Sequence, residues 1–257
     1  RSVAFIRGVH AAIKALQTRF PGQALNVLYA GCGPFATLIM AVLERFRYEP
    51  MILNFLDIHA SSLESVGRLI AHFGFDTQTI NLLNADATGY QHTDAPQLII
   101  VETMQKALEQ EPQVAVTANL APQLGLGGVF IPERITVELG LADLSGEAAD
   151  IDRGGCGIAC PRHLLGTMLE LSAATTTAAE TLNLGTFTVP QLDDLAQLDL
   201  AMFTHIHVFS HYQVHDYDSE ITLPLKCHDV KALCGGDQLQ VSYALGPYPK
   251  FCVSRAH

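Results

Sequence analysis

The sequence predicts an α/β protein: a doubly wound, mostly parallel Rossmann-like sheet followed by a C-terminal β-rich, barrel-like domain. Apolar strand-like runs alternate with helical patterns between residues 20 and 140, which is typical of a parallel sheet. Glycines and acidic residues stand where these runs end. Beyond residue 135, strand-like runs separated by Gly, Asp and Pro replace the alternation, which indicates antiparallel strands.

The first part begins with residues 1–20, whose apolar side chains recur at helical spacing. Residues 27–30 form a short apolar run that reads as a buried strand. The sequence GCGP at 31–34 interrupts it, and helical spacing then resumes as far as residue 46. The same alternation continues, with strands expected at 51–56, 79–83, 97–101 and 129–131 and helices at 61–73 and 114–124.

The second part is expected to contain strands at 135–141, 201–214, 221–225 and 239–245. An Ala- and Thr-rich stretch, 164–182, is interpreted as a helix among them. The change of character near Ile131-Pro132-Glu133 predicts one domain over residues 1–132 and another over residues 133–257.

The composition and net charge of the chain disfavour some classes of binding partner. The chain has 257 residues, 49% of them hydrophobic and 16% charged, and its formal net charge is −11. This charge disfavours a nucleic-acid partner, which needs a basic face, and suits a cationic or neutral substrate. No apolar stretch reaches membrane-spanning length. The six cysteines follow no disulfide framework, so a cytoplasmic protein with free thiols and no membrane partner is expected.

Functional groups follow the ends of four successive predicted strands: glycines at 31 and 33, then Asp57, Asp86 and Glu102. In an open parallel sheet the ligand lies at this edge. Glycine lets a ligand approach the backbone, and an acid about 25 residues later suits a ribose diol. Asp86 would then serve an adenine amino group. Dinucleotide and S-adenosylmethionine binders share this spacing, so both remain open.

The first 140 residues resemble class I S-adenosylmethionine-dependent methyltransferases. The stretches VLYAGCGP, FLDIHASSLE and NADAT resemble the family's glycine motif, ribose-binding strand end and adenine loop. Tyr29 and Phe35 depart from it, standing where an acid and a glycine are usual. The resemblance implies S-adenosyl-L-methionine as cofactor, bound by Ala30, Gly31, Cys32, Gly33, Asp57, Ile58, Asp86, Ala87 and Glu102. A nicotinamide-dinucleotide site, or an α/β domain whose strand-end acids are merely solvated, is the alternative.

The stretch VETMQKALEQEP, 101–112, brings Glu102, Glu109 and Glu111 near one mouth of the sheet. Two carboxylates in a short folded loop could clamp a planar guanidinium. The stretch resembles the double-glutamate loop of protein arginine methyltransferases, with Glu102 and Glu111 in register. The resemblance implies that these two glutamates are catalytic. The alternative is a solvated helix N-terminus carrying favourable acids.

The same resemblance implies that Arg1 holds the methionine carboxylate of the cofactor, and that residues 141–185 form a dimerisation arm of a homodimer. The family's Thr-His-Trp loop has no convincing copy. His215 is the better placed candidate for its histidine and is expected to be catalytic, taking a proton from a substrate amine, whereas Thr204-His205-Ile206 matches two letters. Four histidines at 205, 207, 211 and 215 invite a metal site, but no acid or thiol completes a shell, so no metal is predicted.

The sequence therefore predicts a methyltransferase that modifies a guanidino or amine nitrogen of a cationic or amine-bearing small molecule or peptide. Two alternatives remain: a small-molecule O- or N-methyltransferase with another substrate, and a non-catalytic module that binds the cofactor.

Overall fold

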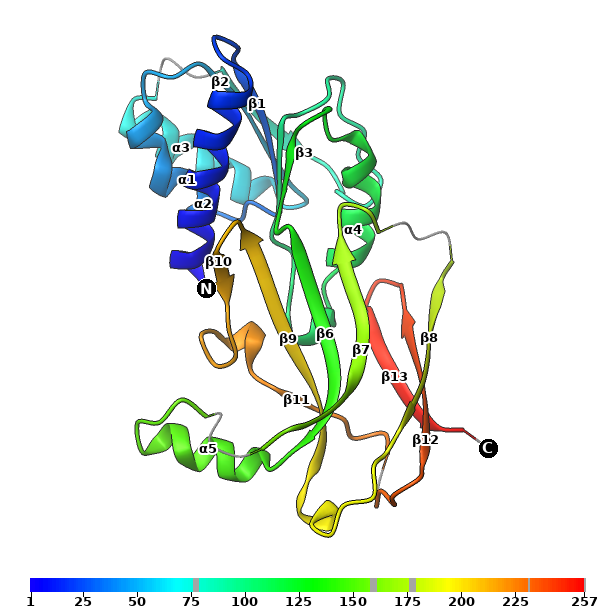
Figure 1. Cartoon of the computed structure of the whole chain (residues 1–257). Helices are drawn as coiled ribbons and strands as arrows, with labels where there is room; N and C mark the ends of the chain where they lie inside the picture. The colour runs from blue at the N-terminus through cyan, green and yellow to red at the C-terminus, as the bar shows by residue number, and fades with distance from the viewer. Residues whose placement is uncertain (76–78, 158–160, 176–178, 231, 257) are drawn as a thin grey trace.

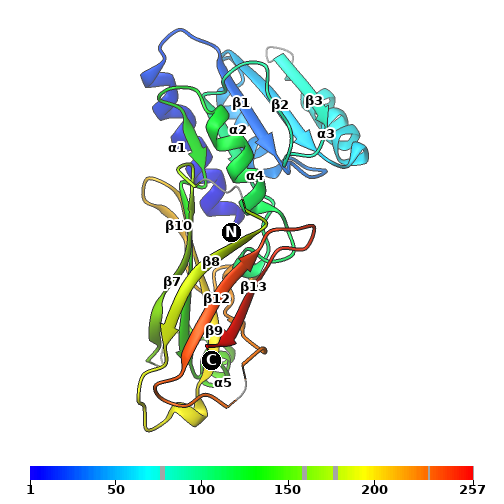
Figure 2. The same ribbon diagram turned by 90° about the vertical axis from the view of Figure 1, so that its right-hand side faces the viewer.

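A computed structural model describes residues 1–75, 79–157, 161–175, 179–230 and 232–256. Figures 1 and 2 show the parallel sheet with its helices at one end of the molecule and the antiparallel strands at the other. Helix α1 (Ser2–Arg19) packs against β5 and, in the second part, against β9 and β10. No helix in the described part of the chain is long and apolar enough to cross a membrane.

The first sheet, within the described residues, has five parallel strands in the order β3-β2-β1-β4-β5. Their bounds are β1 Leu25–Ala30, β2 Met51–Asp57, β3 Thr79–Asn84, β4 Leu98–Val101 and β5 Val129–Ile131. The helices and 3-10 turns of this part are α2 Thr37–Leu43, η1 Glu44–Phe46, α3 Ala60–Phe73, η2 Lys106–Leu108, α4 Gln113–Leu120 and η3 Ala121–Gln123. The predicted alternation of strands and helices is confirmed.

Side chains of the central strands alternate between two hydrophobic layers. Val27 and Tyr29 of β1 belong to the layer that includes α1, α2 and α3, whereas Leu28 and Ala30 belong to the layer covered by α4. Strand β4 alternates in the same way. Helices therefore cover both faces of the sheet, which confirms the doubly wound arrangement.

The second part consists of two antiparallel sheets, ordered β10-β9-β6-β7 and β13-β12-β8, with β11 paired to β9. Their bounds are β6 Arg134–Ala142, β7 His163–Ser172, β8 Thr181–Thr188, β9 Asp199–Phe209, β10 Tyr212–Val214, β11 Leu225–Lys226, β12 Gln238–Ala244 and β13 Lys250–Arg255. Between them lie α5 Leu144–Asp152, η4 Leu195–Gln197 and η5 Glu220–Thr222. Inward side chains of both sheets share one core, which confirms the β-rich part.

Two expectations for this part need correction, and one strand was not expected. The stretch 164–182 is not a helix, because β7 pairs with β6 and β8 pairs with β12; residues 176–178 lie outside the described part. Pairing with these neighbouring strands outweighs the helical preference of the alanines, two of which form the turn at 173–174. The stretch 221–225 is mostly a 3-10 turn, and strand β13 was not predicted.

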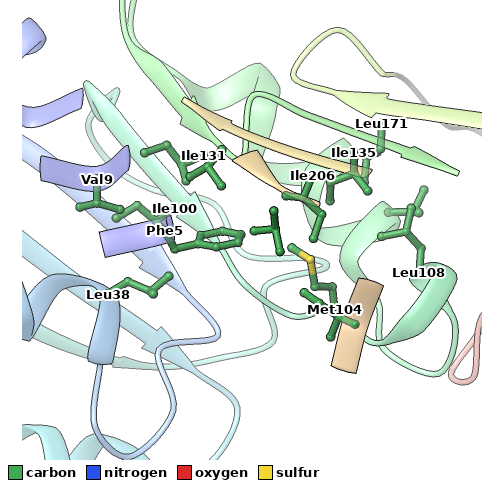
Figure 3. Packing of buried hydrophobic residues seen from close by; sticks show 14 of the residues in the cluster. Phe5, Val9, Leu38, Ile100, Met104, Leu108, Ile131, Ile135, Leu171 and Ile206 are labelled. Carbon is green, nitrogen blue, oxygen red and sulfur yellow. The ribbon is translucent and has the colours of Figure 1, made fainter. Parts of the chain in front are cut away.

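The two parts share a continuous hydrophobic core. Phe5 of α1, Ile131 of β5 and Ile206 of β9 belong to one buried cluster, shown in Figure 3. The chain changes sheets between Ile131 and Arg134, through a cis peptide bond before Pro132. The segment that follows β4 contacts β9, so the carboxyl ends of the parallel strands lie against the β-rich part.

Candidate functional site

A pocket of about 390 Å³ lies at the carboxyl ends of the parallel strands. It gathers eight of the predicted site residues: Gly31, Gly33, Asp57, Ile58, Asp86, Ala87, Glu102 and Glu111. A second pocket of about 170 Å³ adjoins it, since both are lined by Gly31, Gly33 and Glu102. Arg1 and Cys32, also predicted, line the second pocket together with Tyr29 and Phe35.

The glycine turn between β1 and α2 has two glycines with positive φ, at positions 31 and 33. A Cβ atom at Gly31 would lie 2.4 Å from Thr103 Cγ2 and 2.8 Å from Glu102 O, so this glycine permits close packing of the segment after β4. A Cβ at Gly33 would meet no atom within 4 Å. Gly33 therefore borders open pocket space, where its backbone is accessible to a ligand.

Asp57 is buried at the end of β2 and anchors this turn. One carboxylate oxygen accepts a hydrogen bond from the Gly33 N–H at 2.9 Å, and the other accepts from the His59 N–H at 2.9 Å. The exposed Asp86 accepts from both the N–H and the hydroxyl of Thr88 at 2.8 Å. Both acids line the large pocket and retain further lone pairs for a ligand.

Glu102 follows β4 and is mostly buried. Its N–H donates to the carbonyl of Ala30, which lines neither pocket, and its carboxylate lies 3.1 Å from the Arg1 guanidinium. Burial raises the pKa of Glu102 to about 7, with Arg1 opposing this shift and the negative charge of Glu111 adding to it. Glu111 thus places its negative charge near Glu102, in the pocket that both residues line.

The segment between the two glutamates has a strained backbone. Ala107, Leu108 and Gln110 have positive φ values of 50°, 57° and 67°. Such conformations are unfavourable for residues other than glycine, and they persist only where neighbouring structure enforces them. The β-rich part supplies those contacts through three hydrogen bonds, Ala107 N–H to Thr204 Oγ1, Tyr243 O–H to Leu108 O, and Gln110 N–H to Pro249 O.

The structure separates the three glutamates of this segment. Glu111 lines the large pocket, and Gln105 Nε2 donates to its carboxylate at 3.2 Å. Glu109 instead accepts a hydrogen bond from the Phe251 N–H of β13 at 3.0 Å and does not line either pocket. Glu102 and Glu111 therefore share the pocket, and Glu109 holds the segment to the β-rich part.

Cys32 is part of the glycine turn, and Tyr29 lies near the end of β1, just before it. Burial raises the pKa of the Cys32 thiol to about 12, so the thiolate needed for nucleophilic attack is scarce near neutral pH. Burial also raises the pKa of Tyr29 well above its usual range. Both side chains therefore line the second pocket in their uncharged forms.

His215 does not line either of these pockets. It lies after β10 in a third pocket that Arg1 also borders. Thr204 holds Ala107, while His205 extends toward Glu138, with Nε2 3.0 Å from its carboxylate. Among the described residues, no three His, Cys, Asp or Glu side chains are grouped to hold a metal ion.

Several residues that line the large pocket were not predicted from the sequence, because they are neither charged nor glycine. Thr103, Pro112 and Val116 line the large pocket, and Gln113 is fully buried beside Thr103. Thr103 and Pro112 directly follow the two glutamates in the sequence, and this adjacency is the signal that could have found them.

The fold defined by this geometry, a doubly wound parallel sheet continued by antiparallel sheets, is that of solved protein arginine methyltransferase structures. Protein arginine methyltransferase 10 of Arabidopsis thaliana matches with a TM-score of 0.61 and 12% identity, over 95% of this chain and 84% of that chain. The Trypanosoma brucei PRMT1 enzyme–prozyme heterotetrameric complex with AdoHcy matches with a TM-score of 0.56 and 14% identity, over the same shares of the two chains. No protein-family model and no curated protein matches the chain.

Proposed function

We propose that this chain is an S-adenosylmethionine-dependent methyltransferase that modifies a guanidino or amine nitrogen. The observation that carries the proposal is that one pocket joins two sets of groups. Gly33, Asp57 and Asp86 form one wall, suited to a nucleoside, and Glu102 and Glu111 form another, suited to a cation.

The residues present fit the cofactor. Open space at Gly33 admits a ligand against the backbone, and the fixed carboxylate of Asp57 suits a ribose diol. The Asp86 carboxylate suits an adenine amino group, and Arg1 in the adjoining pocket suits a carboxylate. The AdoHcy in the T. brucei complex supports this assignment at the level of fold.

When bound, S-adenosylmethionine supplies a sulfonium methyl group that a nitrogen nucleophile accepts. The two glutamates supply what the acceptor needs. In their ionised form, Glu102 and Glu111 can accept hydrogen bonds from a planar guanidinium and fix its orientation. The partial burial of Glu102 strengthens this interaction, because charges attract more strongly where water is excluded.

Calorimetry with S-adenosylhomocysteine tests the cofactor assignment. We expect the wild-type chain to bind it and the Asp57→Ala variant to lose that binding, because the carboxylate holds both the turn and the ligand. Binding of NAD without binding of S-adenosylhomocysteine would overturn the assignment.

Methyl-transfer assays, read by mass spectrometry, test the acceptor. Arginine, arginine peptides, histidine and simple amines are compared. Glu111→Gln should retain cofactor affinity and lose most of its turnover, because the clamp loses one of its charges. Transfer to a hydroxyl or carboxylate, with the glutamate variants fully active, would favour an O-methyltransferase and overturn the clamp.

A second candidate is a module that binds the cofactor without catalysis. It is favoured by the two departures from the glycine motif. Tyr29 is buried and neutral where an acid is usual, and Phe35 is 65% exposed beside the second pocket. Cofactor binding without transfer to any acceptor would support this module.

We also propose a homodimer, supported by the small and apolar residues among positions 141–185. The described residues of this range include the end of β6, α5, β7 and part of β8. Light scattering at tens of micromolar tests this proposal, and a monomer would contradict it.

A further inference from the structure

A third pocket, of about 350 Å³, lies between the first two turns of α1 and the β10 hairpin. Arg1 and Arg7 line it from the helix, and His211, Tyr212 and His215 line it from the hairpin. It adjoins the second pocket of the candidate site, because Arg1 lines both. The methyl-transfer site proposed above does not include Arg7 or His211, which line this pocket.

The charge of this pocket is opposite to that of the chain. Arg1 is the N-cap residue of α1 and Arg7 lies in its second turn, and both line this pocket. Asp218 is the acidic residue of the lining, and its carboxylate already accepts the backbone N–H of His215 at 2.8 Å. The lining thus carries two guanidinium groups and one carboxylate, in a chain of net charge −11. Because Arg1 also pairs with Glu102 outside this lining, Arg7 is the cation left for a ligand.

Arg7 is available to a ligand. It is exposed, and it makes no hydrogen bond or ion pair with any residue that the structure describes. His211 and His215 are exposed as well, and the His211 ring lies against Tyr212 with 4.1 Å between ring centroids. Guanidinium and imidazole N–H groups are donors that suit a carboxylate.

Glu102, one of the glutamate pair, lies beside Arg1, which borders this pocket. Arg1 Nη1 is 3.1 Å from Glu102, while the same side chain borders the pocket that contains Arg7. An acceptor that presents its guanidinium to Glu102 and Glu111 and extends past Arg1 would bring its other end to Arg7. Val3, which is 61% exposed, adds apolar surface for the methylene groups between the two ends.

We propose that this pocket binds a carboxylate of the methyl acceptor, so that the acceptor is a small guanidino acid of the arginine type. The inference rests on the proposed function and narrows its substrate class. An arginine within a peptide carries an amide at this position, and agmatine carries nothing, so neither would satisfy Arg7. The geometry also gives His215 a binding role beside Arg7 rather than a role in proton transfer.

Calorimetric titration of the full chain with arginine and with agmatine, both in the presence of S-adenosylhomocysteine, tests the proposal. We expect arginine to bind about tenfold more tightly or better, because a charge-assisted hydrogen bond contributes that much. Arg7→Gln should remove this preference and leave agmatine binding unchanged. Lys14→Gln is the matched control, because Lys14 is an exposed cation of the same helix that lines none of the three pockets.

The outcomes separate this inference from the proposed function. Equal binding of arginine and agmatine would overturn the carboxylate pocket and leave the glutamate pair intact. Binding of neither would overturn the glutamate pair and the pocket with it. Methyl transfer to an arginine peptide at least as efficient as transfer to arginine would also overturn the carboxylate pocket, since the peptide offers no carboxylate there.

Discussion

The buried side chain of Gln113 accepts hydrogen bonds from both the backbone N–H and the hydroxyl of Thr103, at 2.9 and 3.0 Å. Its Nε2 donates to the carbonyl of Val101 at 3.4 Å, and its own N–H donates to the carbonyl of Glu111 at 2.9 Å. One residue thereby holds the backbone on both sides of Glu102 and joins it to the second glutamate.

Replacing Gln113 by Met should loosen Glu102 without touching the cofactor pocket. We expect kcat for methyl transfer to fall about 100-fold, because small displacements of a positioning group are costly. The affinity for S-adenosylhomocysteine should be retained, because Gln113 lines neither pocket. The free energy of unfolding should fall by about 1–3 kcal/mol as the Thr103 N–H loses its acceptor. Methyl-transfer assays measure kcat, calorimetry measures the affinity for S-adenosylhomocysteine, and urea denaturation measures the free energy of unfolding.

Gln97→Met provides the control. Gln97 Oε1 accepts the N–H of Asn26 at 2.7 Å, so it is also a side-chain amide bound to backbone, but at the start of β1, away from the pocket. Its replacement should lower stability and leave kcat unchanged. An equal loss of kcat in both variants would show that the Gln113 effect is general loosening of the sheet.

Gly33→Ala should abolish cofactor binding in a folded protein. The added Cβ meets no protein atom within 4 Å, so the methyl group occupies pocket space that the ligand needs. The positive φ of 60° adds about 1–2 kcal/mol of strain. Calorimetry with S-adenosylhomocysteine and urea denaturation separate the two effects.

Alanine substitutions at two other glycines with positive φ serve as controls. Gly22→Ala carries similar strain, with φ of 74° and open space around its Cβ, but lies in a turn away from the pocket. It should lose stability to the same extent and bind normally. Gly31→Ala should lose more stability than either, because its Cβ would collide with Thr103 and Glu102. Weakened binding in Gly22→Ala would mean that strain alone explains the Gly33 result.

The groups at the carboxyl ends of the parallel strands could be predicted from the sequence. The central parallel strands are buried and read as continuous apolar runs. The carboxyl ends of all parallel strands share one edge, including that of the exposed edge strand β3, so Asp57, Asp86 and Glu102 were expected to meet there. The roles of Glu109 and Glu111 could not be assigned in this way. They depend on β13, whose Phe251 lies 142 positions from Glu109.

The strands of residues 163–172 and 181–188 show a related limit. Their apolar residues alternate imperfectly, and each is a strand because β6 or β12 lies beside it. Pairing partners of an antiparallel sheet are distant in sequence, and local periodicity does not identify them. Gln113 was missed for the same reason, since its role depends on contacts rather than on residue type.

The raised pKa of Glu102 makes stability fall as pH increases. In the folded chain this carboxyl holds its proton up to a pKa of about 7, whereas its ordinary value is 4.5. The folded state therefore binds more protons between these values, and stability decreases by up to about 3 kcal/mol as pH rises through them. Urea denaturation at pH 5 and pH 8 should show this decrease in the wild type relative to Glu102→Gln, which lacks the titration. Parallel changes in both would contradict the assignment.

Activity should change with pH in the opposite direction. The ionised form of Glu102 is the one that accepts hydrogen bonds from a guanidinium, so kcat/KM should rise through pH 7 and level off above it. Arg1→Met should move this rise to higher pH, because Arg1 favours the ionised carboxylate. A profile that is flat between pH 6 and pH 8 would exclude Glu102 as the titrating group.

Replacing Arg162, whose side chain is only 10% exposed, should lower the free energy of unfolding strongly. Its guanidinium lies 2.6 Å from the fully buried Glu147 and 2.8 Å from Asp216, and it stacks on Phe203 with 4.2 Å to the ring centroid. Arg162→Met leaves the buried carboxylate of Glu147 and the largely buried carboxylate of Asp216 without a counter-charge, which typically costs about 3–5 kcal/mol of unfolding free energy.

Arg153→Met is the contrasting variant. Arg153 is 72% exposed and lies 3.9 Å from Asp150, and such a pair contributes at most about 1 kcal/mol. Urea denaturation of both variants measures the difference. Because burial of uncompensated charge is the cause, the double variant Arg162→Met with Glu147→Gln should recover part of the loss. A double variant less stable than Arg162→Met would show instead that packing against Phe203 and the hydrogen bond from Tyr217 to Glu147 dominate.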